Sequence, residues 1–112
     1  MVKLLFVLMN EYRLWALPQA LAALERRYPG AVEGRGYSVR EINADAGLER
    51  ALLADGAAAD MAFLASHGSI QNLYCFSRLW EALEGRPVYF TSTMGDELAE
   101  LLPRLGLEPA LY

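Results

Sequence analysis

The sequence predicts an α/β fold in which helices cover both faces of a parallel β-sheet. The uninterrupted apolar run Met61–Ala65 has the length of a strand and ends at the polar cluster Ser66–Ser69, which is typical of a strand buried on both faces. Another apolar run, Val2–Met9, opens the chain. Segments with helical leucine spacing alternate with these runs, and short connections between alternating elements favour parallel strands with right-handed crossovers.

Composition sets the class of protein. The chain has 112 residues, of which 54% are hydrophobic and 21% charged, and this describes one globular domain. The net charge of −4 and the lack of a basic stripe argue against a nucleic-acid partner. The N-terminal apolar run is too short to span a membrane and lacks a signal-peptide cleavage site. Cys75 is the only cysteine, so no internal disulfide can form, and we expect a cytoplasmic location.

The first predicted strand, Val2–Met9, is followed by a polar exit loop at Asn10–Arg13. Proline is tolerated only in the first turn of a helix, so Pro18 predicts that the next helix begins near Leu17. Pro29-Gly30 ends that helix. Its inner face is expected to consist of Leu14, Leu17, Leu21, Leu24 and Tyr28.

The segment Ala31–Gly36 reads as a loop. Tyr37–Ile42 alternates apolar and polar residues with a period of two, which predicts a partly exposed strand near a sheet edge. Asn43 and Asp45 are candidate N-caps of a short second helix, and Asp55-Gly56 is expected to end it.

After the central run, Asn72 is a candidate N-cap for a third helix that ends at Gly85. Pro87–Phe90 is the fourth predicted strand, and Thr91–Gly95 is its exit loop. The inner face of this third helix is expected to consist of Phe76, Leu79, Trp80 and Leu83. Leu5, Val7, Phe63 and Leu64 are expected to be almost fully buried in the sheet.

The C-terminal segment predicts one more helix. Thr93 and Asp96 resemble a capping box, and Pro103 is expected to kink this helix before Gly106 ends it. Its inner face would be Leu98, Leu101, Leu102 and Leu105. The residues Leu107–Tyr112 look like the lead-in to further structure. We therefore expect a single α/β domain over residues 1–112 that is a fragment of a larger protein.

The predicted architecture is a three-layer sandwich, flavodoxin-like or Rossmann-like, with strand order 2-1-3-4. No Gly-x-Gly-x-x-Gly follows the first strand, so the dinucleotide-binding form is not indicated. In this order the exit loops of strands one and three meet at a topological switch point, where open α/β sheets bind ligands. The polar residues there suit a polar or carboxylate-bearing ligand, although loops at strand ends are commonly polar. They are Asn10, Glu11, Tyr12, Ser66, His67, Gly68 and Ser69, with Thr91, Ser92 and Thr93 alongside.

His67, the only histidine, could serve as an acid–base or as a hydrogen-bond donor to an anion. The alternative is a loop histidine bonded to nearby backbone. A dedicated metal site needs further ligands, and no other His or Cys stands at ligand spacing. Cys75 is expected to be a small core residue.

Other ligand classes find less support in the sequence. Flavin binding is weakly indicated, because Glu11 would repel a phosphate in the first loop. The cobalamin-binding pattern Asp-x-His-x-x-Gly fails at Ala65 and Ile70. A response-regulator receiver would need an acidic pair after the first strand and an Asp at the end of the third strand, and the sequence has neither.

The order of features resembles the N-terminal part of the large subunit of cobaltochelatases and magnesium chelatases. The resemblance runs through Tyr37–Ile42, a short helix, Ala59–Leu64 and then His67-Gly68, and it continues into Pro87–Phe90. It covers most of this chain but only a small part of a family member. Ser69 stands where the family tends to have a second glycine.

The resemblance implies an ATP-dependent ligase that inserts Co²⁺ or Mg²⁺ into a tetrapyrrole, as in cobalamin biosynthesis. Its partners would be the remainder of the large subunit and separate ATPase subunits, and this domain would carry no cofactor and not be catalytic alone. The absence of a Gly-x-x-x-x-Gly-Lys-[Ser/Thr] loop agrees with that division. The alternatives are a stand-alone flavodoxin-like module for a small anionic ligand or flavin, and a bare interaction domain.

Overall fold

The computed structural model of the chain describes residues 1–8, 11–66 and 69–92. They contain a four-stranded, all-parallel sheet with the order β2-β1-β3-β4. This confirms the predicted fold class and strand order. The strands are β1 Val2–Leu8, β2 Val32–Ser38, β3 Met61–Ser66 and β4 Val88–Ser92.

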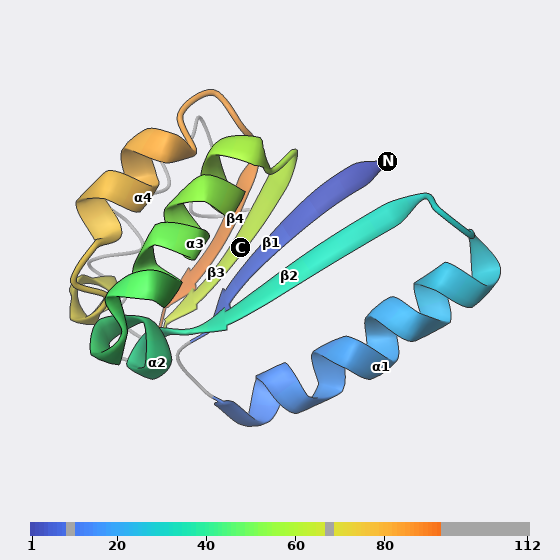
Figure 1. The fold of residues 1–112 in the computed structure, drawn as a ribbon, viewed down its shortest axis with the longest axis horizontal. Coiled ribbons are helices and arrows are strands. Elements are labelled where there is room, and N and C mark those ends of the chain that lie inside the picture. The colour runs from blue at the N-terminus through green and yellow to red at the C-terminus, as the bar shows by residue number, and fades with distance from the viewer. Residues whose placement is uncertain (9–10, 67–68, 93–112) are drawn as a thin grey trace.

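Helices lie on both faces of the sheet and give the three layers (Figure 1). On one face α1 packs over β2 and β1, whereas α3 and α4 pack together on the opposite face. The short α2 directly follows the carboxyl end of β2. The helical segments are α1 Glu11–Arg27, α2 Val39–Ala44, α3 Ala46–Ala58, the 3₁₀ turn η1 Ile70–Asn72 and α4 Phe76–Ala82.

The main core lies between the sheet and the α3–α4 layer. Leu5, Val7 and Leu64 are buried there, as predicted. The expectation for Phe63 is wrong, because its side chain is half-buried on the other face. Residues along β3 alternate between buried and half-buried, since α1, the one described helix on that face, covers β2 and β1 instead.

A row of aromatic rings crosses this half-covered face. Phe6, Phe63 and Tyr89 are register partners on β1, β3 and β4. The Phe6 and Phe63 rings stack with centroids 5.0 Å apart, and the Phe63 and Tyr89 centroids are 6.2 Å apart. Tyr89 ends the row and remains 45% exposed. The rings shield one another, so this side of β3 is partly buried although α1 covers β2 and β1 instead.

The first helix begins earlier than predicted. α1 starts at Glu11, so Glu11–Arg13 is helical and not part of an exit loop. Pro18 lies inside the helix, where it removes one backbone hydrogen bond without ending the helix. α1 continues on both sides of the proline, and a helix of 17 residues can absorb the loss of one bond.

The second strand was also misplaced. The predicted loop Ala31–Gly36 is largely β2, and much of the predicted strand Tyr37–Ile42 is α2. Gly34 weakens the strand signal in the sequence, because glycine is uncommon in strands. The structure needs a glycine here, since a Cβ would lie 2.5 Å from a methyl carbon of Leu21 on α1. The predicted edge position is confirmed, since β2 is the outer strand next to β1.

The later elements match the predictions in part. Asp45 caps α3 as expected, but that helix continues past Asp55-Gly56 to Ala58. Asn72 ends η1 and does not cap α4, which begins at Phe76. Of the predicted inner face, Phe76, Leu79 and Leu83 are buried and Trp80 is half-buried. β4 extends through Thr91 and Ser92, and the predictions for Thr93–Tyr112 lie outside the described residues.

Candidate functional site

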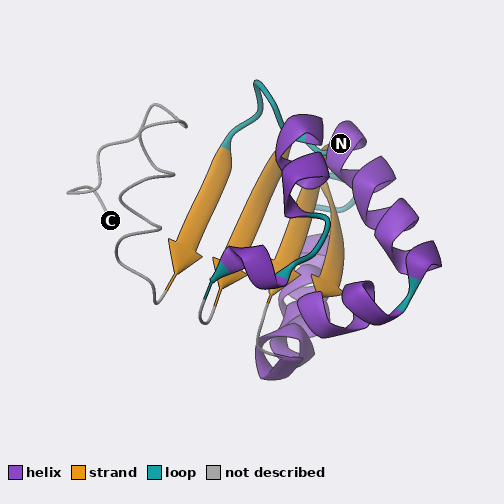
Figure 2. Cartoon of the chain, turned by 90° about the vertical axis from the view of Figure 1, so that its left-hand side faces the viewer, coloured by secondary structure: helices purple, strands orange, loops and turns teal. Residues whose placement is uncertain are grey.

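The switch point lies at the carboxyl ends of β1 and β3. The connections that leave these two neighbouring strands run towards opposite sides of the sheet. β1 connects through α1 to β2 on one side, and β3 connects through α4 to β4 on the other. All four strands end at the same edge (Figure 2). Ser38, Leu8, Ala65 and Thr91 form the aligned row nearest that edge. This is the position at which an open parallel sheet offers a ligand crevice.

The structure describes the side chains of only some predicted site residues. Ser69 and Thr91 are half-buried at the carboxyl edge. Glu11 and Tyr12 open α1, and Ser66 and Ser92 close β3 and β4, but their side chains lie outside the description. The predictions for Asn10, His67, Gly68 and Thr93 fall outside the described residues.

Ser69 helps to shape the loop between β3 and α4. Its hydroxyl oxygen accepts a hydrogen bond of 3.1 Å from the backbone N–H of Gln71, and its carbonyl accepts one of 3.1 Å from the N–H of Asn72. These bonds form the short turn η1, whose Ile70 is buried in the core. The buried Ile70 therefore anchors the described part of this loop to the core.

Asn43, on α2, makes two hydrogen bonds to the loop after β3, a contact that the sequence did not predict. This pair of bonds is called the Asn43 clasp. The side-chain amide nitrogen of Asn43 donates to the carbonyl of Asn72 at 2.6 Å, and its side-chain oxygen accepts from the N–H of Tyr74 at 3.1 Å. The loop after β3 is thus tied to the element that follows β2. Asn43 looked like an N-cap in the sequence, and a contact across 31 positions leaves no local pattern.

Tyr74 stands out in the same loop. Its side chain is 79% exposed, although the flanking Leu73 and Cys75 are buried. Buried neighbours and the two hydrogen bonds of the Asn43 clasp hold the backbone of Tyr74, while its side chain remains exposed in the loop that follows β3. No sequence signal distinguished it, because a tyrosine between two apolar residues reads equally well as part of the core.

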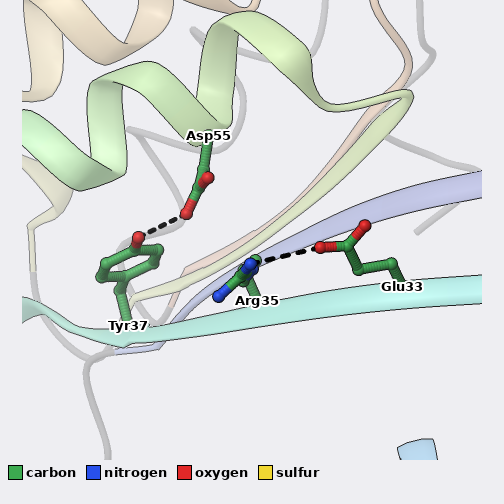
Figure 3. Close-up of polar contacts among 4 residues, drawn as sticks. All are labelled: Glu33, Arg35, Tyr37 and Asp55. Carbon is green, nitrogen blue, oxygen red and sulfur yellow. Dashed lines mark hydrogen bonds and ion pairs between the residues drawn. The ribbon is translucent and has the colours of Figure 1, made fainter.

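A half-buried contact lies near the carboxyl end of β2. The phenol of Tyr37 donates a hydrogen bond to the carboxylate of Asp55 on α3 (Figure 3). Burial, followed by the hydrogen bond and negative charge of Asp55, raises the pKa of Tyr37 to about 12. On the same strand, Arg35 and Glu33 form an exposed ion pair of 3.3 Å. The Tyr37–Asp55 contact ties β2 to α3, and the Tyr37 phenol is no acid–base group near neutral pH.

Cys75 is buried in the core, as predicted. Burial raises its thiol pKa, and the charge of Glu49 adds to this effect. A protonated, buried thiol is a poor nucleophile. Cys75 is therefore a structural residue of the loop that carries Tyr74.

Among the described residues, no group of three or more His, Cys, Asp and Glu side chains could hold a metal ion. No helix in this part of the chain is long and apolar enough to cross a membrane. No protein-family model, curated protein or solved structure matches the chain. The fold and the local geometry are therefore what bears on its function.

Proposed function

We propose that this chain is the N-terminal domain of the large subunit of an ATP-dependent metal chelatase, and that its carboxyl edge binds the tetrapyrrole. The metal ion would be a substrate of the complete enzyme, Co²⁺ or Mg²⁺, and ATP would be used by partner subunits. The observation that supports the proposal is the adjacency of β1 and β3, because open parallel sheets bind ligands beyond the carboxyl ends of such strands. In the sequence, Asn10–Tyr12 follows β1 and His67-Gly68-Ser69 follows β3.

Two described residues at this edge can donate hydrogen bonds to carboxylate groups of a ligand. The protein is acidic overall, with a net charge of −4, so an anionic ligand needs local donors or positive charge. Arg40 lies exposed on α2, directly after β2, and Thr91 supplies a hydroxyl at the end of β4. A tetrapyrrole edge carries carboxylate or amide groups that such side chains bind.

The alternative is a stand-alone module that binds a flavin or another small anionic ligand at the same edge. The strand order 2-1-3-4 favours it, because doubly wound sheets of this kind place flavins at the β1/β3 switch point. Glu11 opens α1 after the first strand, and a carboxylate there opposes the phosphate of a flavin and the carboxylates of a tetrapyrrole alike.

Absorbance titration distinguishes the two functions. The purified chain is titrated at low salt with uroporphyrin, a soluble tetrapyrrole rich in carboxylates, and separately with flavin mononucleotide. The proposal predicts a saturable shift of the porphyrin band and no change in the flavin spectrum. The reverse pattern would favour the flavin module, and a chain that binds neither would contradict both.

A further test addresses the large subunit itself. A chelatase subunit predicts that the coding frame continues past Tyr112 into further domains. A stop codon directly after Tyr112 would contradict the chelatase assignment, even if the chain binds porphyrin.

A further inference from the structure

The exposed ring of Tyr74 is attached to a fixed piece of backbone. Single exposed aromatic residues are common on protein surfaces and by themselves need no explanation. Here the residues on both sides, Leu73 and Cys75, are buried in the core. The backbone N–H of Leu73 also donates to the carbonyl of Ile70 at 2.9 Å. The backbone position of this residue is therefore set by the fold.

Asn43 completes this arrangement from the side of α2. The amide side chain bonds to the backbone on both sides of Leu73, by donating to Asn72 and accepting from Tyr74. One side chain thus pairs with both a backbone carbonyl and a backbone N–H of the loop, as a neighbouring strand would. Because the amide has both a donor and an acceptor, neither Asp nor Leu can make the same pair of bonds.

We infer that Tyr74 is a stacking platform for the flat ring of the ligand, and that Asn43 is the positioning residue that holds it. This inference rests on the proposed function, since it names a contact for the tetrapyrrole at the same edge. An aromatic face stacks on a conjugated macrocycle in an offset arrangement. A platform whose backbone is already ordered loses little entropy when the ligand binds.

The first experiment compares uroporphyrin affinity among tyrosine variants. Tyr74→Ala is expected to weaken binding roughly tenfold, whereas Tyr74→Phe keeps the ring and stays within about twofold. Tyr28→Ala is the matched control, because Tyr28 is 53% exposed and lies in the turn before β2, at the opposite edge of the sheet.

The second experiment separates positioning from contact. Asn43→Ala is expected to accelerate hydrogen exchange at the Tyr74 amide and to weaken uroporphyrin binding severalfold, while Tyr74→Ala changes only the binding. Thermal unfolding of Asn43→Ala shows whether the fold persists, and Asn43→Asp, which keeps the acceptor and loses the donor, provides a milder variant.

Failure of this inference differs from failure of the proposed function. If the native chain binds uroporphyrin but Tyr74→Ala binds it equally well, Tyr74 is no platform and the proposed function stands. Equal losses in Tyr74→Ala and Tyr28→Ala would also overturn the inference. If the native chain does not bind uroporphyrin, the proposed function and this inference are both overturned.

Discussion

Tyr37 and Asp55 join the edge strand to the helical layer above it. The phenol on β2 donates to the carboxylate on α3, and both side chains are half-buried. Because β2 has a strand neighbour on only one side in the described sheet, this contact fixes the carboxyl end of the strand from which α2 and Asn43 continue.

The contact makes stability depend on pH in the alkaline range. The pKa of Tyr37 rises from 10.0 to about 12 on folding, so the protonated phenol stabilises the fold fully below pH 10. That contribution is lost as the pH rises from about 10 towards 12, because a tyrosinate would face the Asp55 carboxylate. Urea unfolding at about pH 9 and about pH 11 should show a larger loss for the native chain than for Tyr37→Phe.

At neutral pH the same variant tests the hydrogen bond itself. Tyr37→Phe should lower the free energy of unfolding by roughly 1 kcal/mol, the typical net contribution of one such bond. A variant that is as stable as the native chain at neutral pH and equally sensitive to alkali would show that the contact has no energetic effect.

Gly56 allows α3 to approach α4 and the sheet. A Cβ at this position would lie 3.0 Å from a methyl carbon of Leu79 and 3.9 Å from one of Leu5. Gly56→Val should therefore destabilise the fold by roughly 2 kcal/mol, the usual cost of overpacking. Ala57→Val, at an exposed position of the same helix, is the control, and similar losses in both variants would contradict the packing argument.

Asp45 should contribute measurably as a helix cap. Its carboxylate accepts hydrogen bonds from the N–H groups of Gly47 at 2.8 Å and Leu48 at 3.2 Å. Asp45→Ala should cost roughly 1 kcal/mol in denaturant unfolding, whereas Asp45→Asn should be nearly neutral because asparagine caps equally well. An equal loss in both would point to the negative charge as the source of stability.

His67 tests the predicted ligand contact. His67→Ala should weaken uroporphyrin binding by roughly 1–3 kcal/mol, the cost of leaving a polar ligand group unpaired, with little effect on unfolding. Gln71→Ala is the control from the same loop, because the hydrogen bond from Gln71 to Ser69 uses the backbone N–H. Unchanged affinity in His67→Ala would remove this histidine from the site.

The sheet could be predicted because its strands carry local signals. Val2–Met9 and Met61–Ala65 are apolar runs of strand length, and the alternation with helices implies parallel pairing and a short list of strand orders. β2 was not predicted at its true position, because Glu33, Gly34 and Arg35 are not typical strand residues. They are accepted at an edge, where one side of the strand needs no partner.

The site could be predicted only as a region. Strand ends can be located approximately from the sequence: Ser69 lies in the loop after β3, and Thr91 lies in β4 itself and not in its exit loop. The hydrogen bonds of Asn43 and the exposure of Tyr74 depend on contacts between residues far apart in the chain, and neither residue belongs to a local motif. The apolar residues Val39 and Ile42 stand three positions apart, which is the helical spacing that could have predicted α2. Both are buried in the structure.

The most direct test is to map the uroporphyrin site by nuclear magnetic resonance of backbone amides in the labelled chain. The carboxyl-edge site predicts chemical-shift changes concentrated at Ser69, Tyr74, Thr91 and the first turn of α1, with little change around Tyr28 and Gly30 at the opposite edge. Shifts clustered at that opposite edge, or along the exposed Tyr89 face with none in the loop after β3, would contradict the account.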